Sequence, residues 1–294
     1  MVKKSIIELA QGSIVWTDEV IGDVVRDWVY KLSNLMATGT KLIKVKGLTG
    51  LDAHWEFPSE LTADYPVAIG TVVHPQKIEW LKYGLTLEQA QVHVLMLDDA
   101  KLRGDSQYQN QITTKRAAEA LTKTKDHEIL GKIAAGAGAT TVTAANKWDV
   151  AAGDPEGNIV DAWGNILAES NVTDSDLKKT ALLIPAKALP QLMKLQLIGN
   201  VQQSMRAYLK ETYGIELFAT RDSQIVTDAY LLVMGPDTGV HGELHTNKIP
   251  LQEKERLYGQ GDRWLVRQFF KTKITPESET VSTSYRICKI ATIL

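Results

Sequence analysis

The stretch that decides the fold runs from Asp105 to Ala135 and reads DSQYQNQITTKRAAEALTKTKDHEILGKIAA. As one unbroken helix it would be about 46 Å long, at roughly 1.5 Å per residue. Gly104 precedes it, Asp105 or Ser106 can cap its first N–H groups, and Gly136 ends it. Its apolar side chains are few and fall on one narrow stripe, formed by Tyr108, Ile112, Ala118, Ile129, Leu130 and Ile133. Such a helix lies on other elements along one side only, which is typical of a plate-like or elongated subunit.

The composition describes a folded protein without a strong electrostatic field. The chain has 294 residues, of which 44% are hydrophobic and 23% charged, enough for one large or two modest domains. With 33 basic and 35 acidic residues the net charge is −2, so binding to nucleic acid would have to be local. The N-terminus lacks a signal peptide and no apolar window reaches the length of a membrane span, which predicts a cytoplasmic protein that contacts no membrane.

Residues 1–40 are predicted to form an N-terminal arm with one amphipathic helix that starts at Asp18 and ends at Gly39. Its wide apolar face has helical spacing and consists of Val20, Ile21, Val24, Val25, Trp28, Val29, Leu32, Leu35 and Met36. This face packs either on its own subunit or on a neighbour, and the sequence leaves the two alternatives open.

The segment 48–86 differs from the rest of the chain, because it combines turn formers and three prolines with short apolar alternations. It follows a predicted strand at 41–47, precedes another within 87–102, and reads as a long hairpin with too little apolar content for a core of its own. We therefore expect its packing partner to lie outside the subunit. Together with the arm it supplies the predicted intersubunit contacts Trp28, Trp55, Phe57, Ile78, Trp80 and Tyr83.

Beyond the long helix, residues 134–158 are rich in Gly and Ala, contain a turn signal at 154–157 and are interpreted as a domain boundary, within which Gly136-Ala137-Gly138 is interpreted as a flexible joint. Helices and strands then alternate, which indicates a sheet with helices on its faces. The predicted helices are 158–170, with Ile159, Val160, Trp163, Ile166 and Leu167 on one face, 188–197 and 198–214. The predicted strands are 178–186, 215–220, 228–235 and two closing strands at 262–275 and 281–294, which pair with each other or return to the first domain.

No catalytic template is met, so no catalytic, cofactor-binding or metal-binding residue is predicted. His127-Glu128 is followed by Gly131 where a zinc-binding helix would need its second His. His241 and His245 lie four apart in a segment interpreted as a loop, which is too few groups for a metal site. The single cysteine, Cys288, cannot form an internal disulfide and reads as a small apolar residue of a C-terminal strand.

The order of these parts resembles that of the Hong Kong 97-type major capsid proteins of tailed viruses, whose fold encapsulin compartment shells share. The resemblance rests on element order and apolar placement in 77–103, 105–135, 182–195, 214–235 and 263–294. It implies an α+β fold in four parts: an N-terminal arm, an extended hairpin loop, a peripheral domain with a spine helix, and an axial α/β domain. The implied boundaries are 1–40 for the arm, 48–86 for the loop, 41–47 with 87–146 and 250–294 for the peripheral domain, 105–135 for the spine helix, and 147–249 for the axial domain.

The resemblance implies a structural protein and not an enzyme. Such a subunit would self-assemble through pentamers and hexamers into an icosahedral shell and enclose double-stranded DNA without sequence-specific binding. Scaffolding, portal or decoration proteins are further implied partners, and the virion, assembled in the host cytoplasm, is the implied location. Two alternatives stay open: an encapsulin-like shell that houses an enzyme cargo, and a cytoplasmic α/β enzyme whose only support is the pair His241 and His245.

Overall fold

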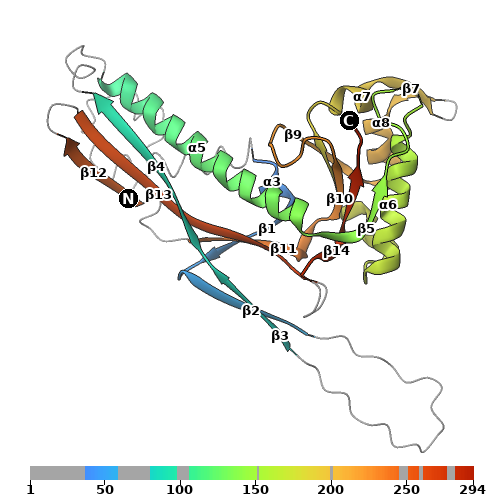
Figure 1. Cartoon of the computed structure of the whole chain (residues 1–294), viewed down its shortest axis with the longest axis horizontal. Coiled ribbons are helices and arrows are strands. Elements are labelled where there is room, and N and C mark those ends of the chain that lie inside the picture. Colours follow the sequence, from blue (N-terminus) through green and yellow to red (C-terminus); the bar gives the residue numbers. More distant parts are fainter. Residues whose placement is uncertain are drawn as a thin grey trace, which may run out of the picture.

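The structure is a computed structural model, and two β-sheets joined by one long helix organise it (Figure 1). It describes residues 37–58, 80–97, 106–150, 152–198, 201–244, 251–257, 261–276 and 282–294. The mixture of separate sheets and helices confirms the predicted α+β class. The predicted helix of the arm, with Trp28, and the tip of the hairpin, with Ile78, lie outside the described residues.

The long helix α5 (Ser106–Ala135) begins within one residue of its predicted start, ends at its predicted last residue and is unbroken at Thr122. Its buried apolar face confirms most of the predicted stripe and extends it, with Ala117, Ala118, Leu121, Ile129, Leu130 and Ile133. Ile112 is 42% exposed, so its place on the buried stripe is wrong. Among the α5 side chains that the structure describes, apolar burial runs from Ala117 to Ile133.

The first sheet has a long central strand that pairs along both edges. Its strands are β1 (Ile43–Leu48), β11 (Gly235–Leu244), β13 (Gly261–Ile274), β12 (Leu251–Leu257) and β4 (Glu88–Leu97). β13 pairs antiparallel with β4, β12 and β11, and β1 pairs parallel with β11. Helix α5 lies along β4 and β13 (Figure 1).

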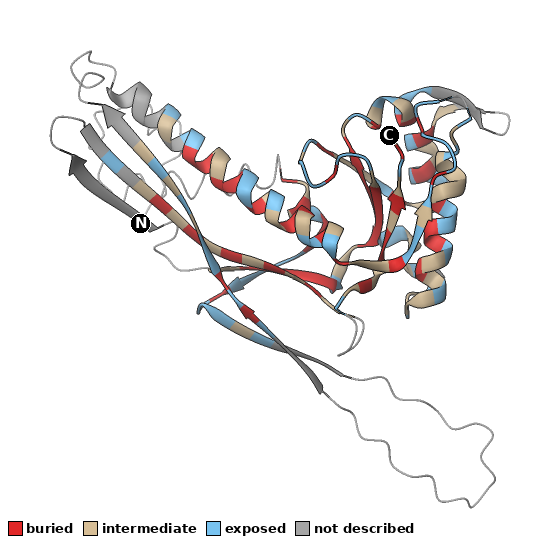
Figure 2. Cartoon of the chain, in the orientation of Figure 1, coloured by how far each residue is buried: buried red, intermediate tan, exposed pale blue. Residues whose placement is uncertain are grey.

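The second sheet is the more apolar one and has the order β5-β14-β10-β6-β9. Its strands are β5 (Ala137–Thr143), β14 (Ser284–Ala291), β10 (Ala229–Val233), β6 (Thr180–Pro185) and β9 (Glu216–Thr220). Every residue of β6 and β10 is buried, as central strands covered on both faces require (Figure 2). Helix α6 (Pro155–Glu169) packs on this sheet through its buried face, while Val160, predicted on that face, is 44% exposed.

The remaining elements are short, and two of them are strands in segments that were predicted to be helical. They are α3 (Gly39–Leu42), the 3-10 helix η1 (Asp174–Lys179), α7 (Leu189–Met193), β7 (Leu195–Ile198), β8 (Val201–Ser204), α8 (Met205–Tyr208) and the π-helical turn η2 (Leu209–Tyr213). The predicted helices 188–197 and 198–214 are thus each partly strand, because β7 and β8 pair as a hairpin between α7 and α8. Strand pairing has overridden the helical spacing of the apolar residues there.

The strand pairing also corrects the predicted grouping of segments. β11, expected within the axial segment 147–249, joins the first sheet, and its residue His241 lies in a strand where a loop was predicted. β5 and β14, expected in the peripheral part, form one edge of the second sheet, so the closing strands β13 and β14 do not pair with each other. Residues 136–138 lead directly into β5 and are no flexible joint. The turn predicted at 154–157 is the start of α6, with Asp154 as its N-cap and Pro155 in its first turn.

Candidate functional site

The candidate site is a two-stranded ribbon that projects from the body of the protein (Figure 1). It consists of β2 (Asp52–Pro58) and β3 (Trp80–Thr86), which pair only with each other among the described strands. An isolated two-stranded ribbon is marginally stable in water. The ribbon therefore depends on its base and on whatever it contacts further out.

The base of the ribbon is held by a small apolar cluster at the edge of the first sheet. The cluster contains Leu48, Leu85 and Leu87, with Ala53, Leu244 and Phe269 packed against them. Gly242 lets β11 approach this cluster closely, since a Cβ there would lie 2.6 Å from Leu85 Cδ2. Polar contacts add to the anchorage: the Leu87 N–H donates to the Leu51 carbonyl at 2.8 Å, and Lys273 Nζ donates to the Gly84 carbonyl at 3.1 Å.

The ribbon brings four of the six predicted contact residues onto one short segment. Trp55 is the register partner of Tyr83, and Pro58 is the partner of Trp80, while Phe57 follows Trp55 by two residues. Close to the base, Thr86 Oγ1 donates to Asp52 Oδ1 at 2.7 Å in an exposed position. Trp28 and Ile78 lie outside the described residues, so the structure does not bring them to this site.

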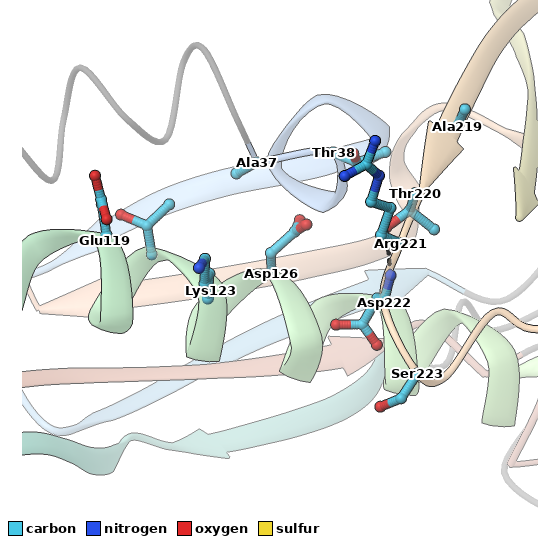
Figure 3. A pocket seen from close by; sticks show the side chains of 11 residues that line it. Ala37, Thr38, Glu119, Lys123, Asp126, Ala219, Thr220, Arg221, Asp222 and Ser223 are labelled. Carbon is cyan, nitrogen blue, oxygen red and sulfur yellow. Dashed lines mark hydrogen bonds between the residues drawn. The ribbon is translucent and has the colours of Figure 1, made fainter. Parts of the chain in front are cut away.

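A second feature is a cavity of about 770 Å³ between α5, the turn before α3 and the loop that follows β9 (Figure 3). Its charged lining is mixed, with Glu119, Lys123, Asp126, Arg221 and Asp222. Burial raises the pKa of Asp126, although hydrogen bonds from the backbone N–H groups of Gly39 and Thr38 oppose this rise. This lining favours no ligand of one charge.

The described residues include side chains of reactive type, among them His127, His241 and Cys288. His241 is fully buried, and His127 lies between Asp222 and Gln224, with no hydroxyl or thiol against its ring. Burial raises the pKa of Cys288 to about 11, which keeps this thiol protonated and unreactive. No group of three or more His, Cys, Asp or Glu side chains suitable for a metal ion occurs in the described part of the chain. His241 lies in strand β11 and not in the predicted loop, and His245, the other residue that supported the enzyme alternative, lies outside the described residues.

Sequence reasoning missed a buried polar cluster between α5 and the first sheet. It consists of Lys125 and Glu128 of α5, His241 and Glu243 of β11, and Thr272 of β13. Lys125 and Glu243 are 118 positions apart, and Glu128 and Thr272 are 144 apart, so no local pattern reveals these pairs.

Among the described helices, none is long and apolar enough to cross a membrane.

The fold of the chain recurs in solved structures of a virus-like particle protein, a phage-related protein and phage capsid proteins. No protein-family model and no curated protein matches the chain. The virus-like particle protein of Pyrococcus furiosus is 12% identical with a TM-score of 0.60, and the match covers 94% of this chain and 100% of that one. A phage-related protein from Bordetella bronchiseptica is 15% identical with a TM-score of 0.62, covering 96% and 98%. The capsid protein of cyanophage P-SCSP1u is 11% identical with a TM-score of 0.57, covering 87% and 88%.

These similarities extend over nearly the whole chain and over nearly the whole of each matched protein. The chain therefore has the fold of shell-forming proteins. In particular, it has the Hong Kong 97-type capsid fold, as its order of elements predicts.

Proposed function

We propose that this protein is a major capsid protein that assembles through pentamers and hexamers into an icosahedral shell around a viral genome. The shared fold supports this proposal, because the solved neighbours include capsid proteins matched over most of their length. In this role the protein is structural and has no enzymatic activity. It would belong to the virion after assembly in the host cytoplasm, with scaffolding, portal or decoration proteins as further partners.

The single observation that carries the proposal is the projecting ribbon β2–β3. It leaves the body of the subunit and is anchored at its base, among the described residues, by the cluster of Leu48, Leu85 and Leu87 and the polar contacts beside it (Figure 1). A repeated contact between such an extension and a different surface of the next subunit is heterologous, and heterologous contacts close into rings and shells. We infer that Trp55, Phe57, Trp80 and Tyr83 of the ribbon contact a neighbouring subunit, as do Ile78 and Trp28.

The proposal keeps the division into arm, extended loop, peripheral domain and axial domain. It assigns β11 to the peripheral domain and β5 and β14 to the axial domain, in accordance with the strand pairing. A net charge of −2 suits a shell that encloses double-stranded DNA without reading its sequence. Confinement needs only local positive charge. Lys41, Lys44 and Lys46 on and beside the edge strand β1 are exposed and offer such charge.

A compartment shell that houses a protein cargo is the second candidate. It is favoured by the match to the virus-like particle protein of Pyrococcus furiosus, which covers that chain completely. The contents of native particles distinguish the two candidates. Nuclease-protected DNA supports the viral capsid, and a co-purifying protein cargo without DNA supports the compartment.

Electron microscopy of the purified protein tests both shell candidates. We expect discrete hollow particles, and a monomer or small oligomer under all assembly conditions would contradict both. Deletion of residues 52–84, with a short glycine linker between Leu51 and Leu85, removes the ribbon and keeps the apolar cluster at its base. This variant should remain folded by circular dichroism and form no shells. If it still forms shells, the ribbon is not the clamp between subunits.

A further inference from the structure

Four consecutive side chains of α5 contact four different elements of the protein. We call Lys125, Asp126, His127 and Glu128 the spine hub. Successive residues of a helix point about 100° apart, so these four side chains project around most of the helix circumference. Each one makes a polar contact outside α5.

Two members of the spine hub hold the first sheet. Lys125 is only 3% exposed, and its Nζ lies 2.8 Å from Oε1 of Glu243 on β11. Glu128 accepts hydrogen bonds from the backbone N–H of Thr272 at 3.0 Å and from the hydroxyl of Thr272 on β13. Between these pairs lies His241, with Nδ1 2.8 Å from Thr272 Oγ1 and Nε2 3.3 Å from Glu243 Oε1.

The other two members hold the opposite side of the helix. Asp126 Oδ1 accepts a hydrogen bond of 2.6 Å from the backbone N–H of Gly39, at the start of α3. α3 is so close here that a Cβ on Gly39 would lie 2.6 Å from Ile129 Cγ2. His127 Nδ1 lies 2.9 Å from Asp222 Oδ1, and its Nε2 lies 3.1 Å from the side-chain amide of Gln224.

Asp222 and Gln224 belong to the loop that joins β9 to β10, two strands of the second sheet. Figure 3 shows Asp126 directed from α5 toward the turn at Thr38, and Asp222 on the loop that passes beside the same helix. One helical turn therefore connects the first sheet, α3 and a loop of the second sheet.

The apolar contacts of α5 do not define this geometry by themselves. Ile129, Leu130 and Ile133 are fully buried in a cluster that also contains residues of the second sheet, but apolar burial is not directional. The chain itself passes from β10 to β11, and so from one sheet to the other, through the single residue Met234. Hydrogen bonds and ion pairs of 2.6 to 3.1 Å fix both distance and direction.

We propose that the spine hub sets the angle between the two sheets and thereby the curvature and diameter of the assembled shell. This inference rests on the proposed function, because curvature matters only if the subunit forms a shell.

The test removes the contact to the second sheet and leaves the buried contacts of the first sheet intact. His127 is 46% exposed, so His127→Ala should fold, and Asp222→Ala is the second variant, because it removes the oxygen atoms that face His127 Nδ1. Arg116→Ala is the matched control, since it removes a charge from the same helix outside the spine hub, from a side chain that is 75% exposed.

Two measurements are made on each variant. The first is the diameter distribution of shells by electron microscopy. The second is the distance distribution between spin labels on cysteines replacing His93 of β4 and Asp161 of α6, both exposed, in the unassembled subunit; the native Cys288 is buried and stays unlabelled. We expect a shifted or broadened distance and changed or mixed diameters for His127→Ala and Asp222→Ala, with Arg116→Ala unchanged.

Unchanged distances and diameters in both hub variants would overturn the proposal. A changed distance with unchanged diameter would overturn its link to curvature, and unfolding of both variants would show that these contacts serve the fold instead. If the wild type forms no shells, the proposed function fails, while the spin-label distances still decide whether the hub sets the angle.

Discussion

The two sheets of this protein are stabilised in different ways. In the second sheet every residue of β6 and β10 is buried, and α6 adds Ile159, Ala162, Trp163 and Ile166 to one apolar core (Figure 2). In the first sheet, β1 buries only its two end residues, and helix α5 meets the sheet with the polar side chains of Lys125 and Glu128. The second sheet is thus held by its own apolar core. The first sheet, which also buries Val240, Val266 and Phe270, depends in addition on directional polar contacts.

The largest effect is expected from breaking the buried ion pair of the first sheet. Lys125→Met leaves the carboxylate of Glu243 buried without its main cation, and such a change costs about 3–5 kcal/mol. Chemical denaturation should show this loss in the free energy of unfolding. Lys123→Met, at an exposed position of the same helix, is the control and should cost less than about 0.5 kcal/mol. Replacing both partners, with Lys125→Met and Glu243→Leu, should recover part of the loss. An equal loss in the control would mean that the ion pair is unimportant.

Leu182→Ala, at the centre of β6, tests whether apolar packing stabilises the second sheet. Leu182 is fully buried in the core of the second sheet, so its truncation should lower the free energy of unfolding by about 2–5 kcal/mol. The matched change in the first sheet is Val92→Ala on β4, where the side chain is half-buried, with an expected loss of about 1 kcal/mol. Equal losses at the two positions would contradict the statement that apolar packing contributes more to the second sheet than to the first.

Acid should weaken the first sheet through Glu243. Burial alone would raise the pKa of this carboxyl group, but His241 and Lys125 outweigh burial and lower it from 4.5 to about 2. Because the folded pKa lies below the unfolded one, the stabilisation is complete above about pH 5 and is lost as the pH falls toward 2. A lowering from 4.5 to about 2 corresponds to on the order of 3 kcal/mol.

The measurement is the free energy of unfolding at several pH values between 5 and 2, for the wild type and for Glu243→Gln. The wild type should lose on the order of 3 kcal/mol more than the variant over this range. Parallel curves would mean that Glu243 is not coupled to His241 and Lys125.

The sequence predicts the apolar framework well, because burial leaves a periodic pattern. The ends of α5, the buried strands β6 and β10, and the helix α6 are all found close to where the spacing of apolar residues places them. The sequence fails at β11, where Thr238, His241 and Gly242 interrupt any apolar alternation. Gly242 packs against the leucines at the ribbon base, and His241 contacts Thr272 of β13 and lies near Glu128 of α5. These partners lie in distant parts of the chain, so the local sequence does not predict the strand.

The candidate site was predicted only in part for the same reason. A hairpin too poor in apolar residues for its own core could be recognised, and the paired strands β2 and β3 confirm that it is a hairpin. Which of its residues contact a neighbour stays a prediction. The spine hub could not be predicted, since the side chains of KDHE at 125–128 look like an ordinary solvated stretch until the partners more than 85 positions away are known.

The smallest loss of stability is expected at the start of α6. This position tests how much a polar contact contributes beside the second sheet, which is held mainly by apolar packing. The Asp154 carboxylate accepts a hydrogen bond of 2.9 Å from the backbone N–H of Gly157, and Pro155 occupies the first turn. Asp154→Ala removes this cap and should lower the free energy of unfolding by about 1 kcal/mol, whereas Asp154→Asn can still accept the bond and should be nearly neutral. Thermal or chemical denaturation of both variants measures the difference. Because the apolar face of α6 remains packed on the second sheet, the helix should persist in both. If Asp154→Ala instead cost as much as Lys125→Met, directional polar contacts would matter equally in the two sheets, and the contrast between them would fail.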